Sequence, residues 1–547
     1  MKCSRLLWVC VGLLYSTCIY ATNYYINAAE GNDKQQGTRP SKAWKSIAPL
    51  SRIQLKAGDS VLLAAGQTHR GMIAMRQIHG SSTNPIVISG YAFKDHTERP
   101  TVDAGDSLNA LLIQDASFIE IKGVNFTAST PYRAVSANNK AEMRCGILVE
   151  TTQETLFEQI VLQDVKVHDV YYHAQGFTRT AAEVKSANGT QSYGWGIRMI
   201  NHSKTGKLNH VKVLNAEVYN VSHTGIKLTA AKNGINDMEI AHCKVYQTGG
   251  PGMQFSGITN GRIHHNHVDH SGSTADSRNW GRGSGMWTWS CSNIVIEYNR
   301  FENANGPGDS AGVHIDYNCS DVVVQYNVSA NNAGGFCEIL GNNYNCAYRY
   351  NISINDGFRV KGQQGAFQEG KIFWLSGYQG NEKKNAGPYN SYFYNNSIYV
   401  GAHIVPKIAV SSSASGVLIA NNIFYFEKAA AVVAGDQKKK EIDEEGIANV
   451  VFTNNLYVHN NSWPDSFALQ DAAPFFGNPM FKKNGGTSIA DYHPGAADLV
   501  RNKGIFILPI PQDSIGLRIG LQVKQDILGN KINGLPDIGA IELANNE

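Results

Sequence analysis

Three short stretches in the middle of the chain share one pattern, and that pattern decides the fold. They are Asn293-Ile-Val-Ile-Glu-Tyr-Asn299, Asp321-Val-Val-Val-Gln-Tyr-Asn327 and Asn345-Cys-Ala-Tyr-Arg-Tyr-Asn351. Apolar and polar residues alternate within each stretch, which is the period of a β-strand. Their final asparagines follow one another at intervals of 28 and 24 residues. Looser copies of the pattern end at Asn396, Asn422 and Asn455.

A repeat of this length, with short strands and no helical pattern, indicates a β-solenoid. Coils stacked about 4.8 Å apart would pair each strand with the coils before and after it. The recurring asparagine would then form a column at a turn, each side-chain amide binding the next coil. The interval of 45 residues between Asn351 and Asn396 corresponds to two coils or to one coil with a long excursion. A β-propeller would need antiparallel hairpins with two-residue turns, which the sequence lacks.

On these repeats the chain resembles the right-handed parallel β-helix (pectate-lyase-like) superfamily. Residues 24–33 and 56–63 are similar to the N-terminal cap and first coil of its secreted members, and residues 526–542 to their closing tail. The resemblance implies an all-β fold, a single-stranded right-handed parallel β-helix with an N-terminal cap and a C-terminal tail. We expect a signal peptide at 1–21, the cap and first coil at 22–100, the β-helix core at 101–464 and a closing segment at 465–547.

The first 21 residues have the features of a secretory signal peptide. Lys2 and Arg5 precede an apolar run that is too short to span a bilayer, and Ala21 offers a cleavage site. Cys18 suggests a lipid anchor as an alternative, but Thr17 before it does not fit a lipobox. No later stretch of the sequence is apolar over a membrane-spanning length. We therefore expect a secreted or periplasmic protein.

The composition argues against several classes of protein. The chain has 48 Lys and Arg against 45 Asp and Glu, a net charge of +3, and only 17% charged residues. Typical domains have about 25%, so a coiled coil, a charged disordered chain and a basic nucleic-acid-binding face are all disfavoured. Nine cysteines are present, three of them before residue 22. The other six permit disulfides in an exported protein, with buried thiols as the alternative. We expect a monomer with no nucleic-acid partner.

Acidic residues on successive coils give the best catalytic candidates. A shift of 24 residues places Glu338 in register with His314, so Asp316 and Glu338 lie two positions apart in register and share a sheet face. Hydrolysis of a glycosidic bond needs two carboxyl groups, one as the acid and the other as nucleophile or base. Repulsion between them would raise the pKa of one and divide the roles. Asp356, on the next coil, is the third candidate.

Two resemblances to enzyme families follow from the same residues. The order of Gly312-Val-His-Ile-Asp316, Asn327 and Phe336-Cys-Glu338 resembles the β-helical β-xylosidases. That resemblance implies that Asp316 is the nucleophile and Glu338 the acid/base. Related β-helical fucosidases and xylanases use two aspartates on neighbouring coils, which implies Asp316 and Asp356 instead. Both predict a glycoside hydrolase acting on a polysaccharide or oligosaccharide, with no cofactor.

Residues that bind the sugar are expected beside these carboxylates. Aromatic rings stack on sugar faces, and imidazole and guanidinium groups bind their hydroxyls. The predicted substrate-binding residues are His314, Trp280, Trp287, Trp289, Arg349 and Arg359.

Two other functions stay open at this stage. A polysaccharide lyase acting on uronate would use cations such as Lys227, Arg349, Arg359 and Lys361. Its Ca²⁺, where needed, would be held by Asp316, Glu338 and Asp356. A non-catalytic glycan-binding solenoid is the other alternative. The run from His264 to His270 contains four histidines, but Asn266 within it fits the asparagine column, so we expect no metal site there.

Overall fold

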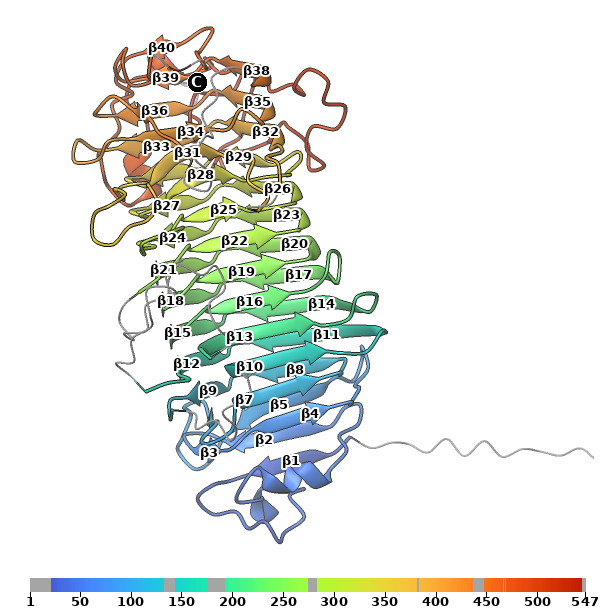
Figure 1. Cartoon of the computed structure of the whole chain (residues 1–547). Coiled ribbons are helices and arrows are strands. Elements are labelled where there is room, and N and C mark those ends of the chain that lie inside the picture. Colours follow the sequence, from blue (N-terminus) through green and yellow to red (C-terminus); the bar gives the residue numbers. More distant parts are fainter. Residues whose placement is uncertain are drawn as a thin grey trace, which may run out of the picture.

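The computed structural model describes residues 21–131, 143–174, 192–273, 283–380, 383–435, 447–465, 467 and 469–543. The chain winds as a parallel β-helix in which three long sheets run along the molecule, and every strand pair within them is parallel (Figure 1). The predicted all-β, single-stranded solenoid is confirmed. Each coil contributes one strand to each sheet over most of the length.

Sheet A contains β1 (Asn23–Ile26), β2 (Ser60–Ala64), β5 (Ile86–Tyr91), β8 (Ile119–Lys122), β11 (Leu156–Gln163), β14 (Lys207–Leu214), β17 (Ile235–Ala241), β20 (Ile258–His264), β23 (Ser292–Glu297), β26 (Ser320–Gln325), β29 (Ala347–Arg349), β32 (Tyr389–Tyr394), β35 (Ser415–Ala420) and β38 (Ala448–Thr453). Sheet B contains β3 (Thr68–Arg70), β6 (Thr101–Asp103), β9 (Asn125–Ala128), β12 (Lys166–Val170), β15 (Glu217–Val221), β18 (Lys244–Thr248), β21 (His267–Ser271), β24 (Arg300–Glu302), β27 (Val328–Ala330), β30 (Ile352–Ile354), β33 (Ser397–Val400), β36 (Ile423–Phe426), β39 (Leu456–Tyr457) and β40 (Phe475–Phe476).

Sheet C contains β4 (Ile73–Arg76), β7 (Asn109–Gln114), β10 (Arg144–Thr151), β13 (Gly194–Asn201), β16 (Ile226–Thr229), β19 (Met253–Ser256), β22 (Met286–Trp289), β25 (Val313–Ile315), β28 (Gly335–Ile339), β31 (Lys371–Leu375), β34 (Lys407–Val410) and β37 (Ala431–Val432). The helical segments of the described residues are short: η1 (Pro40–Lys42), η2 (Ala48–Arg52), η3 (Ile489–Tyr492) and α2 (Ala497–Val500). None of the helices in the described ranges has the length and apolar character needed to cross a bilayer.

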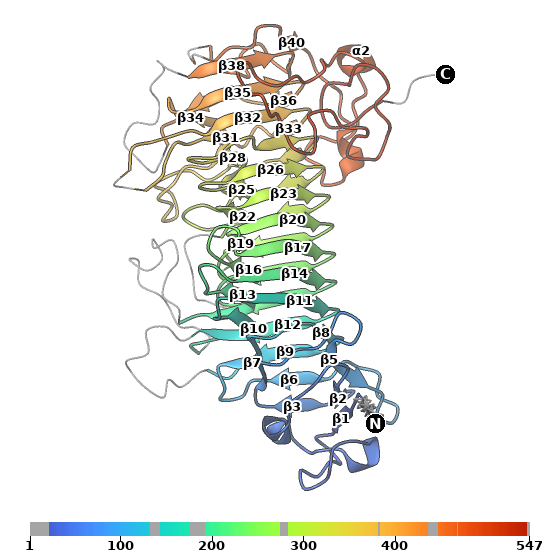
Figure 2. The same ribbon diagram turned by 90° about the vertical axis from the view of Figure 1, so that its right-hand side faces the viewer.

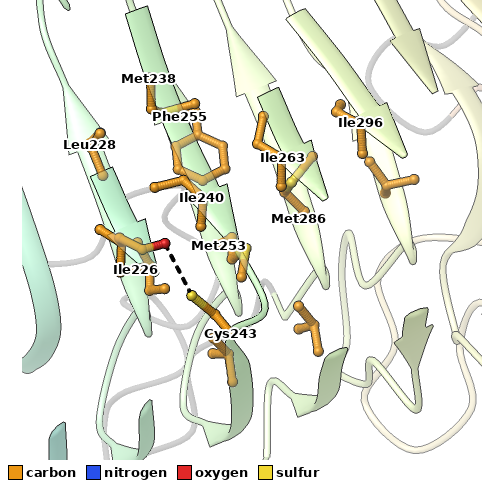
Figure 3. Close-up of a cluster of buried hydrophobic side chains, with 14 of the residues drawn as sticks. Ile226, Leu228, Met238, Ile240, Cys243, Met253, Phe255, Ile263, Met286 and Ile296 are labelled. Carbon is orange, nitrogen blue, oxygen red and sulfur yellow. Dashed lines mark hydrogen bonds between the residues drawn. The ribbon is translucent and has the colours of Figure 1, made fainter. Parts of the chain in front are cut away.

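The core fills the interior of the coil because alternate strand residues point inward. In β16, Ile226 and Leu228 belong to the core while Lys227 between them faces outward. Figure 3 shows Ile226, Leu228 and Cys243 among the buried side chains of successive coils. The six cysteines from Cys145 onward are all buried and form no disulfide with one another, so the buried-thiol alternative holds.

The predicted asparagine column is present inside the turn between sheets A and B. The side-chain oxygen of Asn327 accepts hydrogen bonds from the backbone N–H and side-chain amide of Asn299, at 2.9 and 3.0 Å. The same two bonds join Asn351 to Asn396, and β29 pairs directly with β32. The interval of 45 residues is therefore one coil with a long excursion. The column continues through Asn422 and Asn455.

The C-terminal segment lies along the side of the β-helix, where Figure 2 shows it beside β26 and β33. Asp513 accepts a hydrogen bond from Asn345 on this face, and the carbonyl of Ile505 accepts one from Asn421. Apolar residues of the segment, such as Ile510 and Ile538, are buried in a second cluster against sheets A and B.

Candidate active site

The outer face of sheet C carries Glu338 and His314 side by side. Their strand neighbours, including Ile315 and Ile339, are buried in the core, so His314 and Glu338 face away from it. Ile315 pairs with Ile339, which places His314 opposite Glu338. The register that the sequence predicts for these two coils is confirmed.

Aromatic side chains extend this row on both sides. Trp287 pairs with His314, and the two rings are stacked at a centroid distance of 5.9 Å and an interplanar angle of 9°. Trp374 pairs with Glu338 on the following coil. Trp289, two positions beyond Trp287, is 41% exposed and lies 5.1 Å from the ring of Tyr317. Flat faces of this kind suit a sugar ring.

Asp316 begins the turn immediately after β25. Its backbone N–H donates to the carbonyl of Thr288 at 3.0 Å, which continues the pairing with β22. Its carboxyl oxygen lies 4.0 Å from Nε2 of His314, and the side chain is 20% exposed. Asp316 and Glu338 therefore lie on the same outer face, on adjacent coils, with Asp316 more open to solvent.

Asp309 joins this group from the connection between β24 and β25, and the sequence analysis did not select it. Its half-buried carboxyl group raises the pKa of Glu338 through its negative charge. Its backbone has a positive φ of 46° and is held by the side chain of Gln368, which accepts from its N–H. In the sequence, Asp309 could have been found by its position seven residues before Asp316, just after a Gly-Pro-Gly turn.

The pKa of Glu338 is raised to about 8. Burial is the largest cause, followed by the negative charge of Asp309, and Asp316 adds to it. Lys371 and Arg359 oppose the shift. At neutral pH the Glu338 carboxyl therefore holds its proton.

Lys371, in β31, is a second residue that the sequence analysis missed. It is 2% exposed, and its ammonium group lies 3.9 Å from the ring centre of Trp374. Lys371 lies one coil beyond Glu338, because Gly335 of β28 pairs with Lys371 of β31. No periodic signal marks it, because the 16-residue connection between β30 and β31 breaks the repeat.

Arg359 lies at this site in a different role from the predicted one. Its guanidinium donates to the carbonyls of Gly306 and Asp309 at 3.1 and 2.8 Å, and to those of Gln368 and Glu369 at 2.9 and 3.3 Å. With 6% exposure, it ties the Asp309 loop to the excursion before β31.

The structure places two other predicted residues outside the site. Asp356 is 1% exposed, and its oxygens accept from the backbone and side chain of Asn332 and from Ser353, so it continues an internal turn column. Arg349 lies in sheet A and donates to Gln325, Tyr394 and the carbonyl of Gly520. Both groups are therefore engaged in hydrogen bonds that hold the fold together. Trp280 lies outside the described residues.

The residues of the predicted lyase set do not all lie together. Its proposed calcium ligands included Asp356, whose oxygens are occupied within the wall, and its proposed cations included Arg349, on a different sheet. Lys227 does lie on the outer face of sheet C, four strands before Glu338 in the sheet order.

Comparison with known proteins agrees with the fold. The sequence profile of the family described as "Right handed beta helix region" matches residues 195–360. The chain is 24% identical to a lacto-N-biosidase of Bifidobacterium longum over 96% of its own length, and it spans 37% of that longer protein. A shorter match of 65 residues, 35% identical, links 12% of the chain to 11% of alpha-1,3-galactosidase A of Akkermansia muciniphila.

A solved structure has a similar fold. The crystal structure of a GH136 lacto-N-biosidase from Eubacterium ramulus superposes with a TM-score of 0.52 at 17% identity, covering 78% of this chain and 68% of that one. At this identity the similarity concerns the fold. The coil geometry, the internal asparagine column and these matches identify the chain as a right-handed parallel β-helix protein similar to glycoside hydrolases.

Proposed function

We propose that the chain is a secreted glycoside hydrolase that cleaves oligosaccharides or polysaccharides, with Asp316 and Glu338 as its catalytic carboxyl groups. The observation that carries the proposal is their position on one outer face of sheet C, on adjacent coils. The 24% identity to a lacto-N-biosidase over most of the chain supports it.

The environments of the two groups divide the roles. Glu338, whose pKa is raised to about 8 by burial and by the charge of Asp309, would protonate the leaving oxygen. Asp316, at the solvent-facing side, would act as nucleophile or activate a water molecule. Glycoside hydrolases use such a difference in pKa between two carboxyl groups.

A second assignment keeps Asp316 and gives the other role to Asp309. The observation that favours it is exposure: Asp309 is half-buried, whereas Glu338 is 7% exposed. In that arrangement Glu338 would hold a proton beneath the two aspartates and position them.

We propose a substrate with exposed sugar faces, taken against Trp287 and Trp289. The names of the two curated relatives make glycosides of lacto-N-biose the first substrates to test and α-1,3-linked galactosides the second.

The proposal is tested by incubating the purified chain with these glycans and with plant and algal polysaccharides, followed by mass analysis of the products. Hydrolysis adds one water to each broken bond. Products that absorb in the ultraviolet and gain no water would indicate a lyase instead. Glycan retained on the protein without products would indicate a binding solenoid.

Aryl glycosides with good and poor leaving groups separate the two role assignments. A variant that lacks the general acid keeps much of its activity on a good leaving group and loses it on a poor one. We expect this behaviour for Glu338→Gln, and loss on both substrates for Asp316→Asn. If Asp309→Asn shows the split instead, the second assignment is correct.

A further inference from the structure

Three histidines meet on the opposite side of the β-helix from the carboxylates, at the turn between sheets A and B. His264 ends β20 and His265 follows it, while His242 lies in the same turn one coil earlier. Ala241 pairs with His264, so His242 lies beside His265, and the N–H of His242 donates to the carbonyl of His264 at 3.2 Å. The sequence alone did not join His242 to the run that begins at His264.

The three rings pack against one another. His242 and His265 are stacked at 4.9 Å and 24°, and His264 stands nearly perpendicular to both, at 83° and 85°. One ring nitrogen from each histidine lies within 4.8 Å of the others. The Nδ1 atoms of His264 and His265 are 2.9 Å apart. Zinc–nitrogen bonds of about 2.0–2.1 Å at tetrahedral angles require nitrogens about 3.3 Å apart. Because an imidazole binds a metal in the plane of its ring, the stacked rings of His242 and His265 must turn about their side-chain bonds to share one ion.

A carboxylate orients the most buried ring of the three. Nε2 of His264 lies 3.3 Å from Oε1 of Glu239, and the other oxygen of Glu239 accepts from Lys212 at 2.8 Å. A histidine that donates its Nε2–H to a carboxylate presents Nδ1 as a lone pair, which is the usual arrangement behind a metal ligand. His264 is 7% exposed, so this orientation is fixed by packing.

The backbone that carries the cluster is rigid. His242 and His265 adopt left-handed conformations, with φ of 57° and 55°. Each lies one residue before the internal turn, where Asn266 accepts from the N–H of Cys243 and donates onward to Asn299. Tyr298 closes the far side by stacking on His265 at 5.2 Å.

We propose that His242, His264 and His265 bind one divalent transition-metal ion, with zinc as the reference ion and water as the fourth ligand. Three neutral imidazoles select zinc, copper, nickel or cobalt over calcium and magnesium. The ion would join two successive coils. The proposal is independent of the glycosidase function.

The test uses the untagged chain, freed of metal with a chelator, and titrates it with zinc alone by calorimetry. We expect one equivalent per chain and a rise in the melting temperature with zinc. Cobalt should give the visible absorption of a tetrahedral complex. His242→Gln and His265→Gln, both at exposed positions, should each weaken zinc binding at least tenfold with circular dichroism unchanged.

His267→Gln is the matched control. His267 belongs to the same segment, but its ring lies against Glu302 at 2.9 Å and outside the trio, so zinc binding should be unchanged. Glu239→Gln should weaken binding by about 10–100-fold, the usual effect of losing the partner of a ligand. The proposal is overturned if the chain takes up no zinc, or if the double variant of His242 and His265 binds it as the parent does.

Discussion

Glu338, in β28, and Asp356, just after β30, are two buried carboxyl groups, and the fold uses them in different ways. Both have raised pKa values, about 8 for Glu338 and about 7 for Asp356, and burial is the main cause in each case. Asp356 receives hydrogen bonds from Asn332 and Ser353 that lower its pKa. For Glu338, within the described ranges, the shift is set by burial and neighbouring charges alone.

The difference shows what separates a structural carboxyl from a candidate catalytic one in this fold. Burial and a high pKa occur in both. The oxygens of Asp356 are filled by the turn that they stabilise, whereas Glu338 faces outward among Asp309, Asp316 and Trp374. A group with its acceptors satisfied by the protein has nothing left to offer a substrate.

Glu338→Gln paired with Asp356→Asn gives the largest expected contrast. Removing the acid should lower kcat on a substrate with a poor leaving group by about 10²–10⁴-fold. Asp356→Asn keeps the oxygen that accepts from Asn332 and should leave kcat within about twofold of the parent. Steady-state kinetics on the confirmed substrate measures both.

Circular dichroism and melting temperature are the controls for that pair. Equal losses of activity in the two folded variants would show that the hydrogen-bonded Asp356 and the outward-facing Glu338 do not differ in role.

Asp356→Ala should reverse the contrast, because here the Asp356 variant has the larger effect, and the effect is a loss of stability. It leaves the buried N–H groups of Asn332 without their acceptor, which should cost about 2–4 kcal/mol in the free energy of unfolding. Glu338→Gln breaks no such hydrogen bond and should cost less than about 1 kcal/mol. Urea unfolding monitored by circular dichroism compares them, and a cost for Asp356→Ala as small as that for Glu338→Gln would contradict the structural role.

The pH dependence of the free energy of unfolding tests the structural role of Asp356. The folded pKa of Asp356, about 7, lies above the unfolded value of about 3.9. Its contribution is therefore fully present below about pH 4 and is lost as the pH rises through 7. Asp356→Asn should flatten that part of the stability curve.

The comparison also explains which parts of the site the sequence predicts. The asparagine repeat predicts the coil register, and that register correctly places His314 beside Glu338. For the preceding coil, the 28-residue interval would put Met286 beside His314, whereas the strands pair Trp287 with His314. It says nothing of the long connections, because their length breaks the repeat. Asp309 and Lys371 reach the site through such connections and were missed.

Two predicted site residues lie elsewhere in the coil for a related reason. Arg349 and Asp356 lie in the dense candidate region of the sequence, yet one faces the C-terminal segment and the other an internal turn. Proximity along the chain does not distinguish the three walls of a solenoid. Only the position within the coil does, and for Arg349 the partner lies 171 residues away.

Arg349→Ala extends the comparison to a buried cation whose guanidinium group is hydrogen-bonded within the protein. It removes charge-assisted hydrogen bonds to the carbonyl of Gly520 and to Tyr394, which should cost about 1.5–3 kcal/mol in stability. Activity should be unchanged, because the residue lies in sheet A. Limited proteolysis should cut the C-terminal segment sooner in the variant, while a loss of kcat without a change in stability would restore its predicted role in binding.

Asp309→Asn gives the smallest and most specific effect if Glu338 is the acid. A general acid must be protonated, so kcat/KM of the parent should fall as the pH rises through about 8. The negative charge of Asp309 raises the pKa of Glu338, so removing that charge lowers it and moves this limb of the profile to lower pH. Glu120→Gln, which removes a carboxyl from the outer face of sheet A, should leave the limb where it is. A folded Asp309→Asn variant with no activity at any pH would instead make Asp309 one of the reacting groups, and Glu338 would then be the buried partner that positions it.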